Sequence, residues 1–387
     1  MNNRKDILVL VACTMAAIAG PPAGACSVPV FRYALEEWPP DPYLAVVFHR
    51  GPLGDKDQAV IEGLKRAADD PNVGANIEVQ TVDLAKEVPA ECRKLHEKCS
   101  PKTLPWVAVV NPMRFKGAAR PLEELVAWSG PLDKAEVALL LDSPCRKELA
   151  RRLLKGDSVV WLLLESGSKE KDDAAARTLS AELAQLQKTL AGSLSDPDQP
   201  AAEGMEDVDV SPGVPLKVGF SVLRISRGEA AERGFVTVLL GLMSGSKYEG
   251  PVAMPVFGRG RALTVLAGQD INSENIGDVI GFLTGDCSCQ IKGLNPGIDL
   301  LMAAGWDAAL SGHLMGDNPS PELTSVMPGA TVIPATRPTS HPMDILDNNP
   351  PQSGGKFMFN IIWVLSSVFI VVVIVSVVMM RRNGSRR

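Results

Sequence analysis

The sequence has few of the residue patterns that mark catalytic or cofactor sites. It contains four histidines, and it lacks the His-Glu-x-x-His motif, the phosphate-binding P-loop and Gly-x-Gly-x-x-Gly. The segment Gly241-Leu-Met-Ser-Gly245 does not have the spacing of a nucleophile elbow. We therefore expect no cofactor and no catalytic residues, although an enzyme with an unrecognised site stays open.

The sequence also lacks an excess of positive charge. Its formal net charge is −6, and basic residues gather near the two ends of the chain, which leaves an acidic body. Binding to nucleic acid needs a basic face for the phosphates. We therefore expect no nucleic acid partner, and a body that faces water or basic partners.

The first 25 residues have the pattern of an export signal. Arg4 and Lys5 precede an apolar run over residues 7–20, and Ala23-Gly-Ala25 matches the small-x-small cleavage rule. We expect a signal peptide over residues 1–25, with an uncleaved anchor as the alternative. The next residue, Cys26, follows a sequence that resembles a bacterial lipobox but lacks its bulky apolar residue. Cys26 is therefore a lipidation candidate, and ordinary cleavage before it is the other outcome.

A long hydrophobic run lies near the C-terminus. Residues 357–380 are 24 residues without a charge, and a helix of this length is about 36 Å long, enough to span a bilayer. The basic tail at residues 381–387 follows, and the positive-inside rule places it in the cytoplasm. We expect a single transmembrane helix, with a buried core helix as the less fitting alternative. The body then lies on the periplasmic side of a bacterial inner membrane, with membrane or periplasmic proteins as partners.

Two linker-like stretches divide the remaining chain. Residues 193–215 are acidic and turn-rich, and residues 316–356 have the Pro/Ser-rich composition of a stalk, although each has an ordered surface loop as its alternative. Roughly 330 residues between the signal and the anchor suggest two domains. We place these domains at 43–155 and 156–315, after a lead-in segment at 26–42.

The two halves of the body carry a weak internal repeat. An apolar strand is expected to open each half, at 44–48 and at 158–164, and both halves run β-α-β-α-β-turn-(β)-α, with the strand after the turn expected in the second half. Helical spacing also predicts helices at 122–128 and 297–304. The other expected strands are 78–82, 106–110, 216–223, 252–257 and 262–267, and the other expected helices are 56–69, 89–98, 134–141, 146–154, 170–190, 229–242 and 275–283.

This order of elements resembles the thioredoxin-like fold. In that family a cis-proline opens the strand after the second helix; Pro105 sits at that place, and Pro255 is the nearest match in the second half. The resemblance implies an α/β fold of two tandem thioredoxin-like sandwich domains, to which the transmembrane helix is added. Another α/β sandwich is the alternative. Catalytic members carry Cys-x-x-Cys after the first strand, but residues 49–56 and 165–170 contain no cysteine, so disulfide exchange is not expected here.

Six cysteines remain once Cys13 leaves with the signal, and an even number outside the cytoplasm favours disulfides. Cys92 and Cys99 lie seven residues apart around an expected helix end, and they are disulfide candidates. Cys287 and Cys289 are candidates for a soft metal such as Cu(I), or for a strained, easily reduced disulfide. An inert role, with one of them at a loop or paired elsewhere, is the remaining interpretation.

Two further features carry hypotheses. His49 ends a predicted strand, where a site can form, and a surface or capping histidine is the alternative. The lead-in segment holds Phe31, Tyr33 and Trp38 in a chain with 5% aromatics, so it either docks against the first domain or binds a partner.

Together these patterns predict a membrane-anchored extracytoplasmic protein that acts as a non-catalytic binding or scaffolding module. The alternative function is thiol-redox or copper handling through Cys287 and Cys289.

Overall fold

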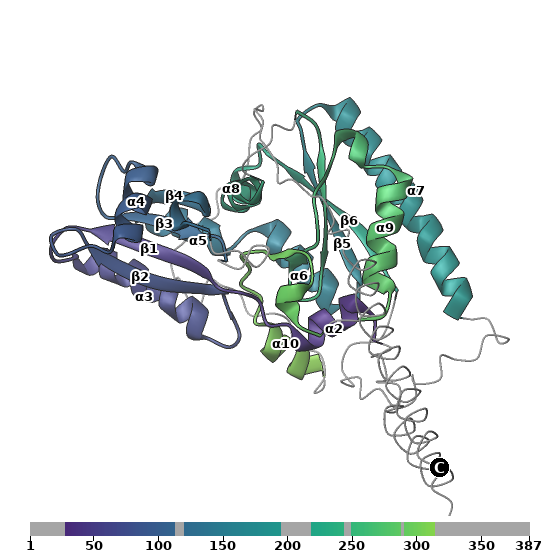
Figure 1. The fold of residues 1–387 in the computed structure, drawn as a ribbon, viewed down its shortest axis with the longest axis horizontal. Coiled ribbons are helices and arrows are strands. Elements are labelled where there is room, and N and C mark those ends of the chain that lie inside the picture. The colour runs from purple at the N-terminus through teal and green to yellow at the C-terminus, as the bar shows by residue number, and fades with distance from the viewer. Residues whose placement is uncertain (1–27, 113–119, 195–217, 244–248, 288–289, 314–387) are drawn as a thin grey trace, which may run out of the picture. The chain divides into compact units, whose positions relative to one another are not determined.

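The computed structural model describes residues 28–112, 120–194, 218–243, 249–287 and 290–313. These residues form an α/β structure with two mixed β-sheets (Figure 1). The predictions for residues 1–26, 195–215 and 316–387 lie outside the described residues.

The first sheet has the strand order β2-β1-β3-β4. Strands β1 and β2 are parallel, whereas β3 is antiparallel to both β1 and β4. Successive side chains of β1 are buried on opposite faces, because a strand alternates its side chains: Ala45 and Val47 pack with α3 and α5, and Val46 and Phe48 pack with α4. The elements are β1 (Tyr43–His49), α3 (Asp55–Asp69), β2 (Ile77–Asp83), α4 (Ala90–Cys99), β3 (Trp106–Val110), the short helix η1 (Leu122–Glu124), β4 (Val126–Pro131) and α5 (Lys134–Leu141).

The second sheet has the order β10-β8-β7-β5-β6, and β9 also pairs with β7. Strand β5 is parallel to β6 and antiparallel to β7, as β1 is to β2 and β3. The elements are α6 (Pro144–Leu154), β5 (Val159–Glu165), α7 (Lys169–Leu194), β6 (Phe220–Ser226), η2 (Ala230–Glu232), α8 (Arg233–Leu242), β7 (Val252–Phe257), β8 (Arg261–Ala262), β9 (Leu266–Ala267), η3 (Gly268–Asp270), α9 (Ser273–Thr284), η4 (Lys292–Leu294), β10 (Ile298–Asp299) and α10 (Trp306–His313).

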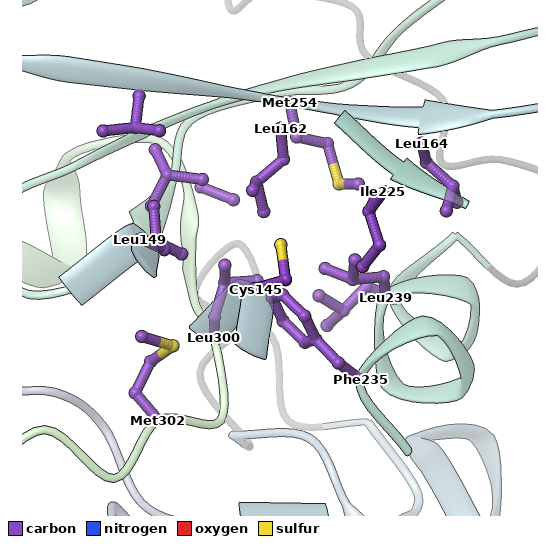
Figure 2. Close-up of a cluster of buried hydrophobic side chains, with 14 of the residues drawn as sticks. Cys145, Leu149, Leu162, Leu164, Ile225, Phe235, Leu239, Met254, Leu300 and Met302 are labelled. Carbon is purple, nitrogen blue, oxygen red and sulfur yellow. The ribbon is translucent and has the colours of Figure 1, made fainter. Parts of the chain in front are cut away.

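Strand β5 is buried on both faces, which explains why it reads as a continuous apolar run. Trp161 and Leu163 face helices α7 and α9, whereas Leu162 and Leu164 face α6 and α8. Figure 2 shows this second cluster, in which the sulfur of Cys145 points toward the side chains of β5.

Helix α8 belongs to the cores of both halves. Val238 packs in the core of the first sheet, whereas Phe235 and Leu239 pack in the core of the second. Two glycines allow this close approach: a Cβ at Gly234 would lie 2.1 Å from the carbonyl oxygen of Leu139 in α5, and a Cβ at Gly241 would lie 2.6 Å from the carbonyl oxygen of Ala127 in β4. The two halves therefore share a helix rather than meeting through side chains alone.

The predicted fold class is wrong. The observed structure is α/β with two mixed sheets, and none of the helices in the described residues has both the length and the apolar character needed to cross a membrane. The run at 357–380 lies outside the described residues. The described residues therefore form an α/β structure with two mixed sheets, in place of the predicted two tandem thioredoxin-like domains plus a transmembrane helix. The peptide bond between Leu104 and Pro105 is cis.

Two predicted α-helices are not formed. Residues 122–128 form η1 and the start of β4, because Val126 and Trp128 pair with the open edge of β3. Helix propensities differ by less than about 1 kcal/mol per residue. The hydrogen bonds that β4 supplies to the otherwise unpaired backbone groups of β3 outweigh this preference. Residues 297–304 are extended because Gly297 has a φ of +110° and the segment then pairs with β8.

The lead-in segment docks on the second half, not on the first. It contains helix α2 (Val30–Glu37), whose Val30 N–H donates to the carbonyl of Gly285 at 3.1 Å. Phe31 and Trp38 are buried among side chains of α7 and α9. Docking on the first domain is therefore wrong, because the apolar face of α2 covers the second sheet.

Candidate functional site

An open cleft lies where the parallel strands β1 and β2 end. Its volume is about 710 Å³, and it is lined by residues of the loop after β1, of β2 itself and of the loop after β2. Ligand sites of open α/β sheets form outside the carboxyl ends of the strands. The polar residues of the lining are His49, Gln58, Gln80, Thr81, Asp83, Lys86 and Glu87.

Asp83 holds the two loops of the cleft in place. Its Oδ1 accepts hydrogen bonds from the backbone N–H groups of Ala85 at 2.9 Å and Gly51 at 3.0 Å. Gly51 can turn the chain here because it has a φ of +72°. The same two N–H groups hold the pKa of the Asp83 carboxyl below its usual value, because they stabilise the charged form.

His49 completes this loop from the end of β1. Its Nδ1 lies 2.8 Å from the Gly51 carbonyl oxygen and donates to it, because a carbonyl oxygen can only accept. In the neutral ring Nε2 is then the nitrogen with a lone pair. His49 thus lines the cleft, as a site residue would, and also fixes the loop after β1, as a capping residue would.

The backbone of β2 adds hydrogen-bonding groups beside the cleft. Tyr43 donates to the Asn76 carbonyl and Leu84 donates to the His49 carbonyl, so the even-numbered residues of β2 are directed toward β1. Because backbone groups alternate in direction along a strand, the N–H and C=O groups of Val79 and Thr81 point away from β1. Because β2 ends the strand order of the first sheet, these groups form an edge against which another strand can pair.

The side chains of the cleft offer groups that donate and accept hydrogen bonds. In the described residues its lining includes no cysteine or serine, and no cluster of three metal-ligating side chains occurs in that part of the chain. The Asp83 carboxylate is a weak base because its charged form is already hydrogen-bonded. Gln80 and Thr81 are exposed, and offer amide and hydroxyl groups that both donate and accept.

The predicted disulfide between Cys92 and Cys99 is not formed, and both are free cysteines. Both lie in α4, where a separation of seven residues is about 10.5 Å along the axis. The Cα atoms of a disulfide lie within about 7 Å of each other. The intact helix therefore keeps the two thiols apart.

The other predicted cysteine site is only partly within the described residues. Cys287 is buried, and its backbone N–H donates to the Val28 carbonyl at 3.0 Å. Cys289 and Cys26 lie outside the described residues. The structure thus places Cys287 in the contact with the lead-in segment.

A buried polar cluster joins the two halves, and its contacts tie neighbouring elements together. Arg146 in α6 donates from Nε to the Leu301 carbonyl at 2.8 Å, and its guanidinium lies over the Phe235 ring. Burial lowers the pKa of Arg146 to about 10. Burial, together with the nearby Glu232 carboxylate, raises the pKa of the Cys145 thiol to about 12. Cys145 is therefore a thiol near neutral pH, and not a nucleophile.

Comparison with known proteins gives no family for this chain: no protein-family model matches it, and no curated protein sequence matches it. The functional inference therefore depends on the geometry of the cleft.

Proposed function

We propose that this protein is a non-catalytic binding module whose ligand is an extended segment of another protein. The segment would pair with the edge of β2 and place side chains in the cleft. The observation that carries the proposal is the juxtaposition of a preformed cleft of about 710 Å³ with the outward backbone groups of Val79 and Thr81. Strand addition to a sheet edge supplies affinity through the backbone, and adjacent pockets supply specificity.

Preorganisation supports this proposal. The contacts of Asp83 with Gly51 and Ala85 fix both loops before a ligand arrives. A site that is already ordered loses less conformational entropy on binding. The cleft volume also lies within the range of about 300–1,000 Å³ that is usual for ligand sites.

The proposed location is the extracytoplasmic side of a bacterial membrane, which is where an export signal over residues 1–25 would direct the chain. The partner is then a periplasmic or membrane protein. The thiol or copper alternative has less support, because Cys287 is buried and the cleft lining has no cysteine in the described residues.

Site-specific photo-crosslinking tests the proposal. A photoreactive amino acid replaces Thr81 in the full chain, produced in its native cell, and the matched control carries it at Lys171, an exposed residue of α7. We expect a discrete protein adduct at position 81 and none of the same mass at position 171. Adducts that are identical at both positions, or no adduct at position 81, would refute the proposal.

Two variants of Asp83 sharpen the test. Asp83→Ala removes the acceptor that fixes the loops, whereas Asp83→Asn keeps an oxygen that can accept the same N–H groups. We expect the adduct at position 81 to decrease strongly in the alanine variant and to persist in the asparagine variant. An adduct that is insensitive to both variants contradicts the assignment to this cleft.

A further inference from the structure

The loop that contains η4 exposes two large apolar side chains. Ile291 is 63% exposed and Leu294 is 71% exposed, whereas the other exposed large apolar residues of the described chain, Leu104 and Phe282, are below 40%. Gly293 lies between them and has no atom near the position of a Cβ. The tip of this loop is therefore an apolar projection.

The one charged residue of the tip is directed inward. Lys292 forms ion pairs with Asp299 and with Asp41, the second at 3.2 Å, and its side chain is 14% exposed. The loop thus carries a lysine without presenting a positive charge to its surroundings. Attraction to anionic groups cannot be the basis of any contact that the tip makes.

Part of the loop backbone is hydrogen-bonded within the protein. Leu294 and Asn295 donate to the carbonyls of Ile291 and Lys292, each at 3.0 Å. The guanidinium of Arg261 holds the carbonyls of Asn295 and Pro296 from below, at 3.0 and 3.2 Å. A satisfied backbone is the condition for entering a medium without water, because an unpaired polar group costs several kcal/mol there.

The first described residues and the start of α10 are each held by contacts near this loop. At the N-terminal side, the Val28 carbonyl accepts from Cys287, a few residues before the loop. At the C-terminal side, α10 is held by Arg259, whose guanidinium pairs with Asp307 at 2.7 Å and also binds the Leu35 carbonyl of α2 at 2.8 Å.

Arg259 and Arg261, two residues apart, thus bind α10 and the loop respectively. The start of α10, the end of α2 and the loop are therefore all held by arginines at the turn between β7 and β8. Cys26, the lipidation candidate, stands two residues before Val28 in the sequence.

We propose that the Ile291–Leu294 loop is a lipid-contact loop, which inserts its two aliphatic side chains into the surface of a bilayer. The tip is convex and aliphatic and lacks exposed aromatic or arginine side chains of the kind that dominate protein interfaces. A bilayer needs apolar area, which Ile291 and Leu294 supply, and the turn of η4 already pairs part of the loop backbone. This inference is independent of the cleft, which lies at the opposite end of the seven-residue strand β1.

Lipid photo-crosslinking in the full chain tests the proposal. A photoreactive amino acid replaces Ile291, and the matched control carries it at Leu104, an exposed apolar residue at the cleft end of the first sheet. The probe is phosphatidylcholine vesicles that contain an alkyne-tagged phosphatidylcholine. Because the readout is local, it does not depend on which other segment holds the chain to the vesicle.

We expect a lipid adduct at position 291 and none at position 104, with the same yield at low and high salt. Leu294→Asp should lower the yield at position 291 about tenfold, because it removes one of the two aliphatic side chains that insert into the bilayer. Leu104→Asp, the matched substitution, should leave that yield unchanged. Equal adducts at both positions, protein adducts without lipid, or vesicle-bound chain with no adduct at position 291 would each overturn the proposal.

Discussion

Replacing Gly234 with alanine tests whether α8 joins the two halves of the protein. A Cβ at this position lies 2.1 Å from the carbonyl oxygen of Leu139 and 2.5 Å from its carbonyl carbon. Ordinary van der Waals contact begins at 3.4 Å. Since both atoms belong to the backbone of α5, they cannot rotate away, and α8 has to shift as a whole.

The magnitude follows from two opposing effects. Overpacking of a close contact costs about 1–3 kcal/mol. Alanine returns at most about 1 kcal/mol of helix propensity, and less in the first turn of α8, where Gly234 lies. We therefore expect Gly234→Ala to lower the free energy of unfolding by about 1–2 kcal/mol.

Gly277 of α9 provides the matched control, because a Cβ there meets no atom within 4 Å. Gly277→Ala should raise the free energy of unfolding by about 0.5–1 kcal/mol. Urea unfolding, followed by tryptophan fluorescence and circular dichroism, measures both variants. Both probes should move together, because α8 contributes to both cores. A Gly234→Ala variant as stable as Gly277→Ala would refute the close packing of α8 on α5.

Three other predictions follow from individual groups. Tyr43→Phe removes the buried hydroxyl that donates to the Asp299 carbonyl at 2.9 Å, and the unpaired carbonyl should cost about 1–3 kcal/mol in urea unfolding; no loss would show that this contact is dispensable. The folded-state pKa of Asp83 is lowered, so its contribution is present above the usual value of 3.8 and is lost as the pH falls through the lowered value. Hydrogen exchange at Gly51 should therefore be slow near neutral pH, faster in Asp83→Ala, and nearly unchanged in Asp83→Asn; equal exchange in both variants contradicts this role. The Cys145 thiol, buried and with a pKa raised to about 12, should resist alkylation near neutral pH and react only in denaturant, and labelling in the native state would contradict its burial.

Local patterns predicted most helices and strands because their apolar periodicity is strong. Strand β5 was predicted from its continuous apolar run, and α3 from its helical spacing. Residues 122–128 and 297–304 were predicted as helices because their local preference is helical, whereas their pairing with β3 and β8 depends on distant segments. Tertiary pairing outweighs propensity at such places.

The cleft could be predicted only in part. His49 was recognised as a strand end, but Asp83 was not connected with it, because the parallel register that brings them together is not visible in the sequence. The edge position of β2 depends on the strand order of the whole sheet. Lys292 is directed inward by Asp41 and Asp299. Asp41 is far away in the sequence, and Asp299 follows Lys292 only after a turn, so neither contact could be predicted.

The claim that this protein binds its partner without modifying it is tested most directly on the protein captured at position 81. The captured partner is purified and mixed with the full chain, and both its affinity and its intact mass after incubation are measured. The account predicts saturable binding that Asp83→Ala weakens and Asp83→Asn preserves, and a partner recovered with unchanged mass. A partner that is cleaved, reduced or otherwise modified during incubation, or that binds equally to both variants, would contradict a binding module built on this cleft.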